Sequence, residues 1–206
     1  MAVRMQIDLG ADREKAAALV RQGSLIVFPT DTVYGIGGAV HSQTAIANLY
    51  DAKKRPLEKG LPVLLADPED VWQVAAHLSP LAQELTAEHW PGPLTLIVAK
   101  RPDLPDNLTP NDGVAVRVPA HAGCRELIRL AGGAIASSSA NIASEPPANT
   151  VGEAESAIGD KVAALLDGGR AKHQLPSTII DCRTATPQLI RQGPLKLQLK
   201  ELAKLK

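Results

Sequence analysis

The chain has 206 residues, with 22 Lys and Arg against 22 Asp and Glu, so its formal net charge is zero. This balance excludes a global positive field of the kind that attracts nucleic acid, although a local patch stays compatible with it. The two cysteines, Cys124 and Cys182, form no CxxC pair, which argues against a disulfide framework and a cysteine zinc site. We expect both to be small buried residues, Cys124 on a helix and Cys182 at a strand end.

No targeting or membrane segment is evident in the sequence. The first ten residues lack the apolar core of a signal peptide, and no apolar run approaches transmembrane length. We therefore expect a cytoplasmic protein without a membrane partner.

The length fits one α/β domain over 1–206, and aromatic residues are only 2%, so Ala, Val, Leu and Ile must build the core. Apolar periodicity and capping signals predict the secondary structure. Helices are expected over 12–22, 42–52, 68–76, 79–89, 121–131 and 150–158. Strands are expected over 25–28, 61–65, 94–100, 114–118, 134–138, 162–166, 178–182 and 188–191. Mixed in this way, the elements predict an α/β fold with a mixed sheet.

The last residues, 195–206, carry leucines on one helical stripe. We expect an amphipathic C-terminal helix that packs on the domain or faces a partner.

The segment 25–38, LIVFPTDTVYGIGG, is the most informative stretch. Its apolar run reads as a buried strand that ends at Pro29, because proline cannot donate to a central ladder. A glycine-rich loop is expected next, with the hydroxyls of Thr30, Thr32 and Tyr34. Ligands of α/β sheets bind where loops leave strand ends. The alternative is a turn whose hydroxyls cap the local backbone.

Four cations follow the second expected helix: Lys53, Lys54, Arg55 and Lys59. Such a cluster suits a polyphosphate, since arginine offers a planar fork and lysine a mobile charge. The alternative is a solvated charge run at a helix C-terminus, where cations are favoured.

Polar residues also lie within, at the end of, or directly before three expected strands. Arg117 lies within the apolar run VAVRVP and needs a partner, which a ligand or a structural ion pair would provide. The serines of SSSAN, 137–141, and Ser177 permit close approach of a ligand, or serve only as turn and strand-start residues. The five histidines are scattered and suggest surface or capping residues, so we assign no acid–base residue and no metal ligand.

Five motifs occur in one order: PTDTVYGIGG, KKRPLEKGL, WPGPLTLIV, VAVRVP with SSSAN, and STIID followed by IRQG. In this order they resemble the YrdC-like family, the threonylcarbamoyl-AMP synthases, in its short bacterial-type branch. The resemblance covers about 15–194. It implies a twisted, largely open mixed sheet with helices around it and a concave ligand groove.

The resemblance also implies roles for site residues. Those implied for L-threonine are Thr32, Arg117, Ser137 and Ser177, with Tyr34 as a weaker candidate. Those implied for ATP are Lys53, Arg55, Lys59, Ser139, Asn141 and Arg191. We expect Mg²⁺ to be held mainly by the phosphates.

The implied reaction joins L-threonine, bicarbonate or CO₂, and ATP to give threonylcarbamoyl-AMP and pyrophosphate, for threonylcarbamoyladenosine modification of tRNA. Expected partners are tRNA or double-stranded RNA and tRNA-modification proteins. One alternative is a non-catalytic RNA-binding module of the same fold, although aromatic residues for base stacking are scarce. Another is related carbamoyl-adenylate chemistry on a different acceptor.

The chain departs from the family pattern at several positions. Leu64 stands where many members have a histidine that touches threonine, Gly113 where a threonine is frequent, and Pro147 where a serine is frequent. SSSAN replaces a commoner Pro-Ser-Ala-Asn form. These departures bear on the contacts more than on the activity.

Overall fold

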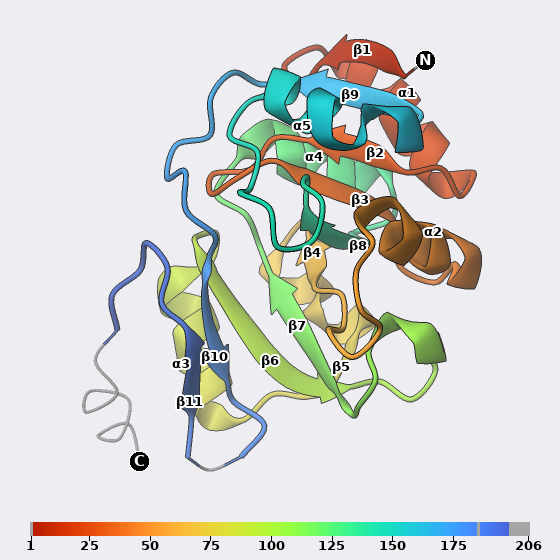
Figure 1. Cartoon of the computed structure of the whole chain (residues 1–206). Coiled ribbons are helices and arrows are strands. Elements are labelled where there is room, and N and C mark those ends of the chain that lie inside the picture. The colour runs from red at the N-terminus through yellow and green to blue at the C-terminus, as the bar shows by residue number, and fades with distance from the viewer. Residues whose placement is uncertain (1, 185, 198–206) are drawn as a thin grey trace.

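A single twisted sheet organises the computed structural model, which describes residues 2–184 and 186–197 (Figure 1). Along the sheet the strands follow the order β1-β9-β2-β3-β8-β4-β7-β6-β10-β11, and β5 pairs with β6. The strands are β1 Val3–Gln6, β2 Ile26–Phe28, β3 Gly35–Ala39, β4 Val63–Leu65, β5 Ala75–His77, β6 Leu94–Lys100, β7 Gly113–Arg117, β8 Ala134–Ser139, β9 Ala164–Asp167, β10 Thr178–Asp181 and β11 Gln188–Arg191.

The sheet is mixed, as the sequence predicted. Four pairs are parallel, namely β1 with β9, β2 with β9, β4 with β7, and β6 with β10; the remaining pairs are antiparallel. In Figure 1 the strands β1, β9, β2 and β3 run across the view, whereas β6, β7, β10 and β11 run in a clearly different direction. This twist brings the ends of distant strands around one concave region.

The helices cover both faces of the sheet. They are α1 Gly10–Arg21, α2 Gln43–Lys53, α3 Pro80–His89, α4 Ala122–Leu130 and α5 Val151–Ile158, with 3₁₀ turns at Pro68–Gln73, Asp106–Leu108 and Gly159–Lys161. Several begin at predicted caps: the hydroxyls of Ser42, Ser79 and Thr150 each accept a bond from the third residue on. His121 caps α4 through its side chain, in line with a capping role for histidine.

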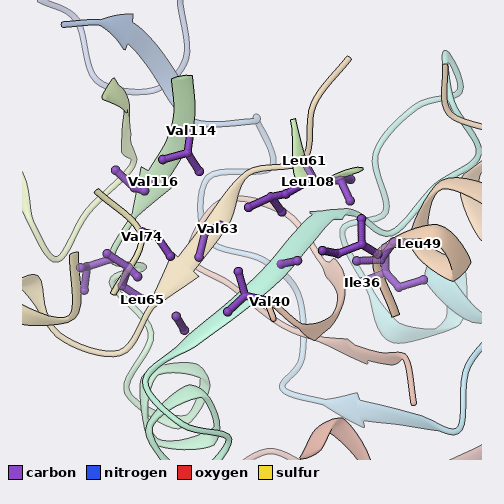
Figure 2. Close-up of a cluster of buried hydrophobic side chains, with 14 of the residues drawn as sticks. Ile36, Val40, Leu49, Leu61, Val63, Leu65, Val74, Leu108, Val114 and Val116 are labelled. Atoms are coloured by element: carbon purple, nitrogen blue, oxygen red, sulfur yellow. The ribbon is translucent and has the colours of Figure 1, made fainter. Parts of the chain in front are cut away.

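Strand β2 shows why the apolar run 25–28 has no polar alternation. Leu25 and Val27 belong to one core cluster, while Ile26 and Phe28 belong to a second cluster that also contains residues of α1 and α4. Alternate residues of a strand face opposite sides, so a strand covered on both faces must be apolar throughout. Figure 2 shows part of the first cluster, where Val63 and Leu65 of β4 lie among side chains from neighbouring elements.

Several sequence expectations were wrong or incomplete. The glycines after Tyr34 lie in strand β3, not in a loop. A Cβ on Gly37 would lie 2.8 Å from the carbonyl oxygen of Ala136 and 3.0 Å from the Phe28 ring. Glycine is therefore required by close packing of this strand, a reason that a turn-based interpretation misses.

The expected helix 68–76 is a 3₁₀ helix that ends at Gln73, and Ala75–His77 then form β5 against β6. Pairing with β6 prevails over the local helical pattern here. Strand β1 was not predicted either. Residues 195–197 are not helical, and the rest of the expected C-terminal helix lies outside the described residues.

Both cysteines are buried, as predicted, with Cys124 in α4 and Cys182 directly after β10. Pro29 follows the last residue of β2, also as predicted. Within the described part of the chain, every helix is too short or too polar to span a bilayer.

Candidate functional site

A cavity of about 460 Å³ opens on the concave side of the sheet. This volume lies in the range typical of small-molecule sites. Segments far apart in the sequence line the cavity: the turn between β2 and β3, the loop after α2, strands β4, β6, β7 and β8, and the open end of the β10–β11 hairpin. Sequence-predicted site residues among its lining are Thr32, Tyr34, Arg55, Lys59, Arg117, Ser137, Ser139, Ser177 and Arg191.

Arg117, at the end of β7, is 5% exposed, and three of its N–H groups donate hydrogen bonds to protein atoms. Its Nε donates to the carbonyl oxygen of Gly92 at 2.9 Å, and its Nη1 donates to Oγ1 of Thr32 at 2.7 Å. Its Nη2 donates to the carboxylate of Asp31, which is 3% exposed. Burial lowers the pKa of Arg117, and the charge of Asp31 opposes that shift. The structural ion pair and the cavity-facing position, offered as alternatives by the sequence, therefore both hold.

The turn that follows β2 also combines two roles. Oγ1 of Thr30 donates to the carbonyl oxygen of Val33 at 2.6 Å and accepts from the backbone N–H of Thr32 at 3.1 Å. The two threonine hydroxyls are 2.9 Å apart. Thr30 thus caps the local turn, and this turn holds Thr32 toward Arg117.

Ser177, which precedes β10, is held by two neighbours in the cavity wall. Its Oγ lies 2.7 Å from Oγ1 of Thr95 on β6 and accepts from Nη2 of Arg191 at 3.2 Å. Arg191 also donates from Nε to the carbonyl oxygen of Ser177 at 2.9 Å. Sequence reasoning missed Thr95, because inside an apolar run a threonine is indistinguishable from any other β-branched strand residue.

The basic loop after α2 faces the same cavity. Arg55 donates from Nε to the carbonyl oxygen of Lys59 at 2.6 Å and from Nη2 to that of Gly60 at 2.8 Å. Burial lowers the pKa of Arg55, and burial followed by the charges of Arg117 and Arg55 lowers the pKa of Arg191. Among the described residues, neither Arg55 nor Arg191 has a carboxylate within salt-bridge distance.

Lys53 lies behind the wall rather than in it. The residue is 1% exposed, and its ammonium donates to the carbonyl oxygens of Ser139 and Asn141. Burial, and then the nearby charge of Arg55, lowers the pKa of Lys53 to about 8. Neither Lys53 nor Asn141 is among the residues lining the cavity. In this geometry Lys53 holds the loop that follows β8.

The departures from the family pattern fall in different places. Leu64 lines the cavity, as expected for the position of a substrate-contacting residue. Gly113 lines a smaller adjoining pocket, where a Cβ would lie 3.0 Å from the Arg183 side chain. Pro147 lies in the loop after β8 and is not among the residues lining the cavity.

Tyr34 closes the back of the site. It is fully buried, and its hydroxyl donates to the carbonyl oxygen of Gly169 at 2.7 Å and accepts from the backbone N–H of Gly168 at 3.1 Å. Burial raises the pKa of Tyr34 to about 12, so the phenol stays neutral at physiological pH. Its role in this geometry is to hold the loop that leads to β10.

The described residues hold no cluster of three or more His, Cys, Asp or Glu side chains that could bind a metal ion. Glu58 is the only carboxylate among the described residues that line the cavity. The chemistry available at this site is therefore that of fixed hydroxyls and cations.

The α/β fold is shared with known proteins. The family model Sua5_yciO_yrdC, described as "Telomere recombination", matches residues 18–193. The threonylcarbamoyl-AMP synthase of Klebsiella pneumoniae is 36% identical over 181 residues, 86% of this chain and 94% of that protein. The enzyme of the same name from Pyrococcus abyssi is 36% identical over 184 residues, 89% of this chain and 54% of that protein.

Solved structures agree. The crystal structure of P. abyssi Sua5 complexed with L-threonine has a TM-score of 0.92 at 33% identity, and the match covers 100% of this chain and 60% of that one. E. coli YciO shares the fold, with a TM-score of 0.86 at 21% identity, over 97% of this chain and 99% of that one. The present chain thus spans little more than half of the Pyrococcus protein and nearly all of the Klebsiella protein.

The chain belongs to the Sua5/YciO/YrdC family. Its membership confirms the resemblance on which the sequence interpretation rested, and the mixed sheet with its concave cavity confirms the fold that the resemblance implied.

Proposed function

We propose that the protein is a threonylcarbamoyl-AMP synthase, a nucleotidyltransferase that acts on L-threonine, bicarbonate or CO₂, and ATP. Support comes from the relatives that carry this name and from the relative whose structure contains L-threonine. One observation carries the proposal: Arg117, which is paired with Asp31, lines the same cavity as Arg55 and Arg191, which have no carboxylate partner among the described residues.

The amino-acid end is built around Arg117. A guanidinium has five N–H donors, and three of the five from Arg117 are spent on Gly92, Thr32 and Asp31. One N–H on each terminal nitrogen is left, which suits a bidentate bond to a carboxylate. We assign the carboxylate of L-threonine to this fork, with the hydroxyls of Ser137 and Ser177 nearby.

The nucleotide end has excess positive charge. Arg55, Lys59 and Arg191 face the cavity, and the proposed ligand for them is the triphosphate of ATP. Ser139, also assigned to ATP, lines the cavity. Lys53 and Asn141 support the wall from behind, so any contact of theirs with ATP is through the backbone that they hold.

The chemistry follows from holding both ligands in one cavity. The threonine amine attacks CO₂, which forms the carbamate C–N bond and releases a proton. A carbamate oxygen then attacks the α-phosphorus, a P–O bond forms, and the bond to pyrophosphate breaks. Alignment of the two ligands and neutralisation of the developing charge supply the catalysis, with no assigned acid–base residue.

Mg²⁺ is proposed as a companion of ATP. With Glu58 as the only described carboxylate in the cavity lining, the protein offers few of the oxygen ligands that this ion prefers. When bound, the ion neutralises phosphate charge, and we expect the phosphates themselves to hold it.

The product would serve threonylcarbamoyladenosine formation on tRNA, in the cytoplasm, where ATP and tRNA occur together. Contact with tRNA or double-stranded RNA and with tRNA-modification proteins belongs to the same proposal.

The test is release of pyrophosphate by the purified protein with ATP, Mg²⁺ and bicarbonate, with and without L-threonine. We expect release that depends on L-threonine. Release independent of threonine, or none, overturns the proposal. Faster release with another amine would favour chemistry on a different acceptor. Steeply salt-dependent tRNA binding without nucleotide affinity would favour the non-catalytic RNA-binding module.

A further inference from the structure

Ser177 lines the cavity, and its hydroxyl contacts side chains from two neighbouring strands. Thr95 on β6 approaches it from one side at 2.7 Å, and Arg191 on β11 donates to it from the other at 3.2 Å. Thr95 and Ser177 are 4% and 6% exposed, so water competes little for these bonds.

The positions of these groups follow from strand pairing. Strands β6 and β10 are parallel neighbours, with Thr95 opposite Ile179. Strand β11 returns antiparallel to β10, with Arg191 also opposite Ile179. Ser177, two residues before Ile179, therefore lies where side chains from both neighbouring strands reach it.

The backbone of Ser177 is held from behind as well. A Cβ on Gly193 would lie 2.5 Å from the carbonyl carbon of Ser177, so only glycine permits this approach. The backbone N–H of Gly193 donates to Oγ1 of Thr178 at 3.0 Å, which ties the end of β11 to the start of β10. Ser177 thus has a fixed main chain and two side-chain partners.

A count of protons defines what the cluster can bind. Arg191 contributes the N–H directed at Ser177, and Ser177 and Thr95 contribute one O–H each. Only two hydroxyl oxygens are available as acceptors within the cluster, and the described residues provide no other acceptor for either hydroxyl. Whichever hydroxyl donates to the other, one hydroxyl proton is left over. Both residues line the cavity, so the pair can donate this proton to an acceptor atom of a ligand.

We infer that Thr95 is a positioning residue: it orients Ser177 so that the hydroxyl pair donates to a carboxylate oxygen of the bound amino acid. The inference rests on the proposed function for the identity of that oxygen. Arg191 then serves both ends of the site, since it holds Ser177 and faces the nucleotide.

Two substitutions of opposite kind test this role. Thr95→Val keeps the volume and removes the hydroxyl, whereas Thr95→Ser keeps the hydroxyl and removes the methyl group. If the hydrogen bond to Ser177 matters, Thr95→Val raises KM for L-threonine by about three- to tenfold and Thr95→Ser by less than about twofold. KM for ATP stays the same in both variants, because Arg191 keeps its bonds to Ser177.

A role in packing alone would give the reverse order, with Thr95→Ser the more damaging variant. Thr86→Val is the matched control, since Thr86 lies on α3 with its hydroxyl bonded to the carbonyl oxygen of Gln83, away from the cavity. Isothermal titration of L-threonine in the absence of ATP repeats the comparison without turnover.

The outcomes separate this inference from the proposed function. If the wild-type protein shows no threonine-dependent pyrophosphate release, the proposed function fails. If the wild-type protein is active and Thr95→Val retains the wild-type KM for L-threonine, or raises both KM values equally, the role of Thr95 is wrong.

Discussion

Arg117 and Arg55 face one cavity but are held in opposite ways. Arg117 is fixed by a buried carboxylate, a hydroxyl and a carbonyl, and its charge is already balanced by Asp31. Arg55 is fixed only by carbonyl oxygens of its own loop, and its charge is not balanced by a carboxylate within the described residues.

The difference teaches how one cavity can treat two anions differently. A guanidinium whose charge is neutralised by a nearby carboxylate and whose position is fixed orients a ligand more than it attracts one. This suits a small carboxylate that must be oriented. An unbalanced guanidinium contributes attraction, which suits a polyanion that brings several negative charges.

Arg117→Ala should abolish threonine-dependent pyrophosphate release, by at least about 100-fold, while binding of an ATP analogue changes little. It should also lower the free energy of unfolding by about 3–5 kcal/mol, because Asp31 is left buried without its partner. The double variant Asp31→Asn/Arg117→Ala removes that charge and should recover part of the stability but none of the activity. Equal loss of threonine and nucleotide binding would contradict the assignment of Arg117 to the amino-acid end.

Arg55→Ala should weaken ATP binding by about 10- to 100-fold, since a charge-assisted bond contributes about 1.5–3 kcal/mol. Binding of L-threonine alone should remain within about twofold, because Arg55 lies at the other end in our assignment. Lys54→Ala is the matched control: Lys54 is the neighbouring exposed cation and does not line the cavity. Titration calorimetry at two salt concentrations measures all of these values. Similar losses of ATP affinity in the two variants would mean that the affinity depends on the total charge of the run 53–59 and not on the residues that face the cavity.

Gly193→Ala should destabilise the fold by about 1–3 kcal/mol, because the new Cβ would meet backbone atoms of Pro176 and Thr178 at 2.4 Å. It should also raise KM for L-threonine by moving Ser177. Gly152→Ala in α5 is the control, since nothing lies within 4 Å of the Cβ added there and helix propensity favours alanine. Thermal unfolding and steady-state kinetics check both. An unchanged KM in a folded Gly193→Ala variant would show that Ser177 tolerates displacement.

A pH dependence of stability is expected from Lys53. Its pKa is about 8 in the folded protein against an ordinary value of 10.5, with burial as the main cause. Between these two pH values the unfolded chain binds more protons than the folded one, so the contribution of Lys53 to stability rises with pH across this window, by at most about 1.4 kcal/mol per pH unit.

Denaturant unfolding of the wild type and of Lys53→Met between pH 7 and about 10.5 isolates this contribution as the difference between the two curves. Lys54→Met controls for an exposed lysine. A flat difference across the window would show that the carbonyl bonds of Lys53 compensate its burial and hold its pKa near the ordinary value.

Most of the residues that the sequence singled out line the cavity. Arg117 stood out because a charged residue in an apolar strand needs a partner, but the sequence did not indicate which partner, since Asp31 lies 86 residues away. Asp31 lies within the first motif, between Thr30 and Thr32, and only the hydroxyl residues of that motif were predicted to contact a ligand. Thr95 carried no local signal at all, because only the register of β6 against β10 sets it beside Ser177.

The secondary structure was predicted correctly where local sequence determines it and missed where distant segments determine it. Caps such as Ser42 and Ser79 involve residues three positions apart, so local sequence predicts them. Strand β3 was missed because its glycines are explained by Phe28 and by the neighbouring strand β8, not by anything adjacent in the chain.

The sequence alone indicates the alternation of helices and strands, the balance of charge, the family and the residue types gathered in its motifs. Each of these depends only on the residues and their order along the chain. Only the tertiary structure decided that Lys53 lies behind the wall while Arg55 faces the cavity, that Asp31 pairs with Arg117, and that Thr95 lies beside Ser177. The physical reason is that side-chain direction and strand register are set by packing between distant segments, which local preferences do not encode.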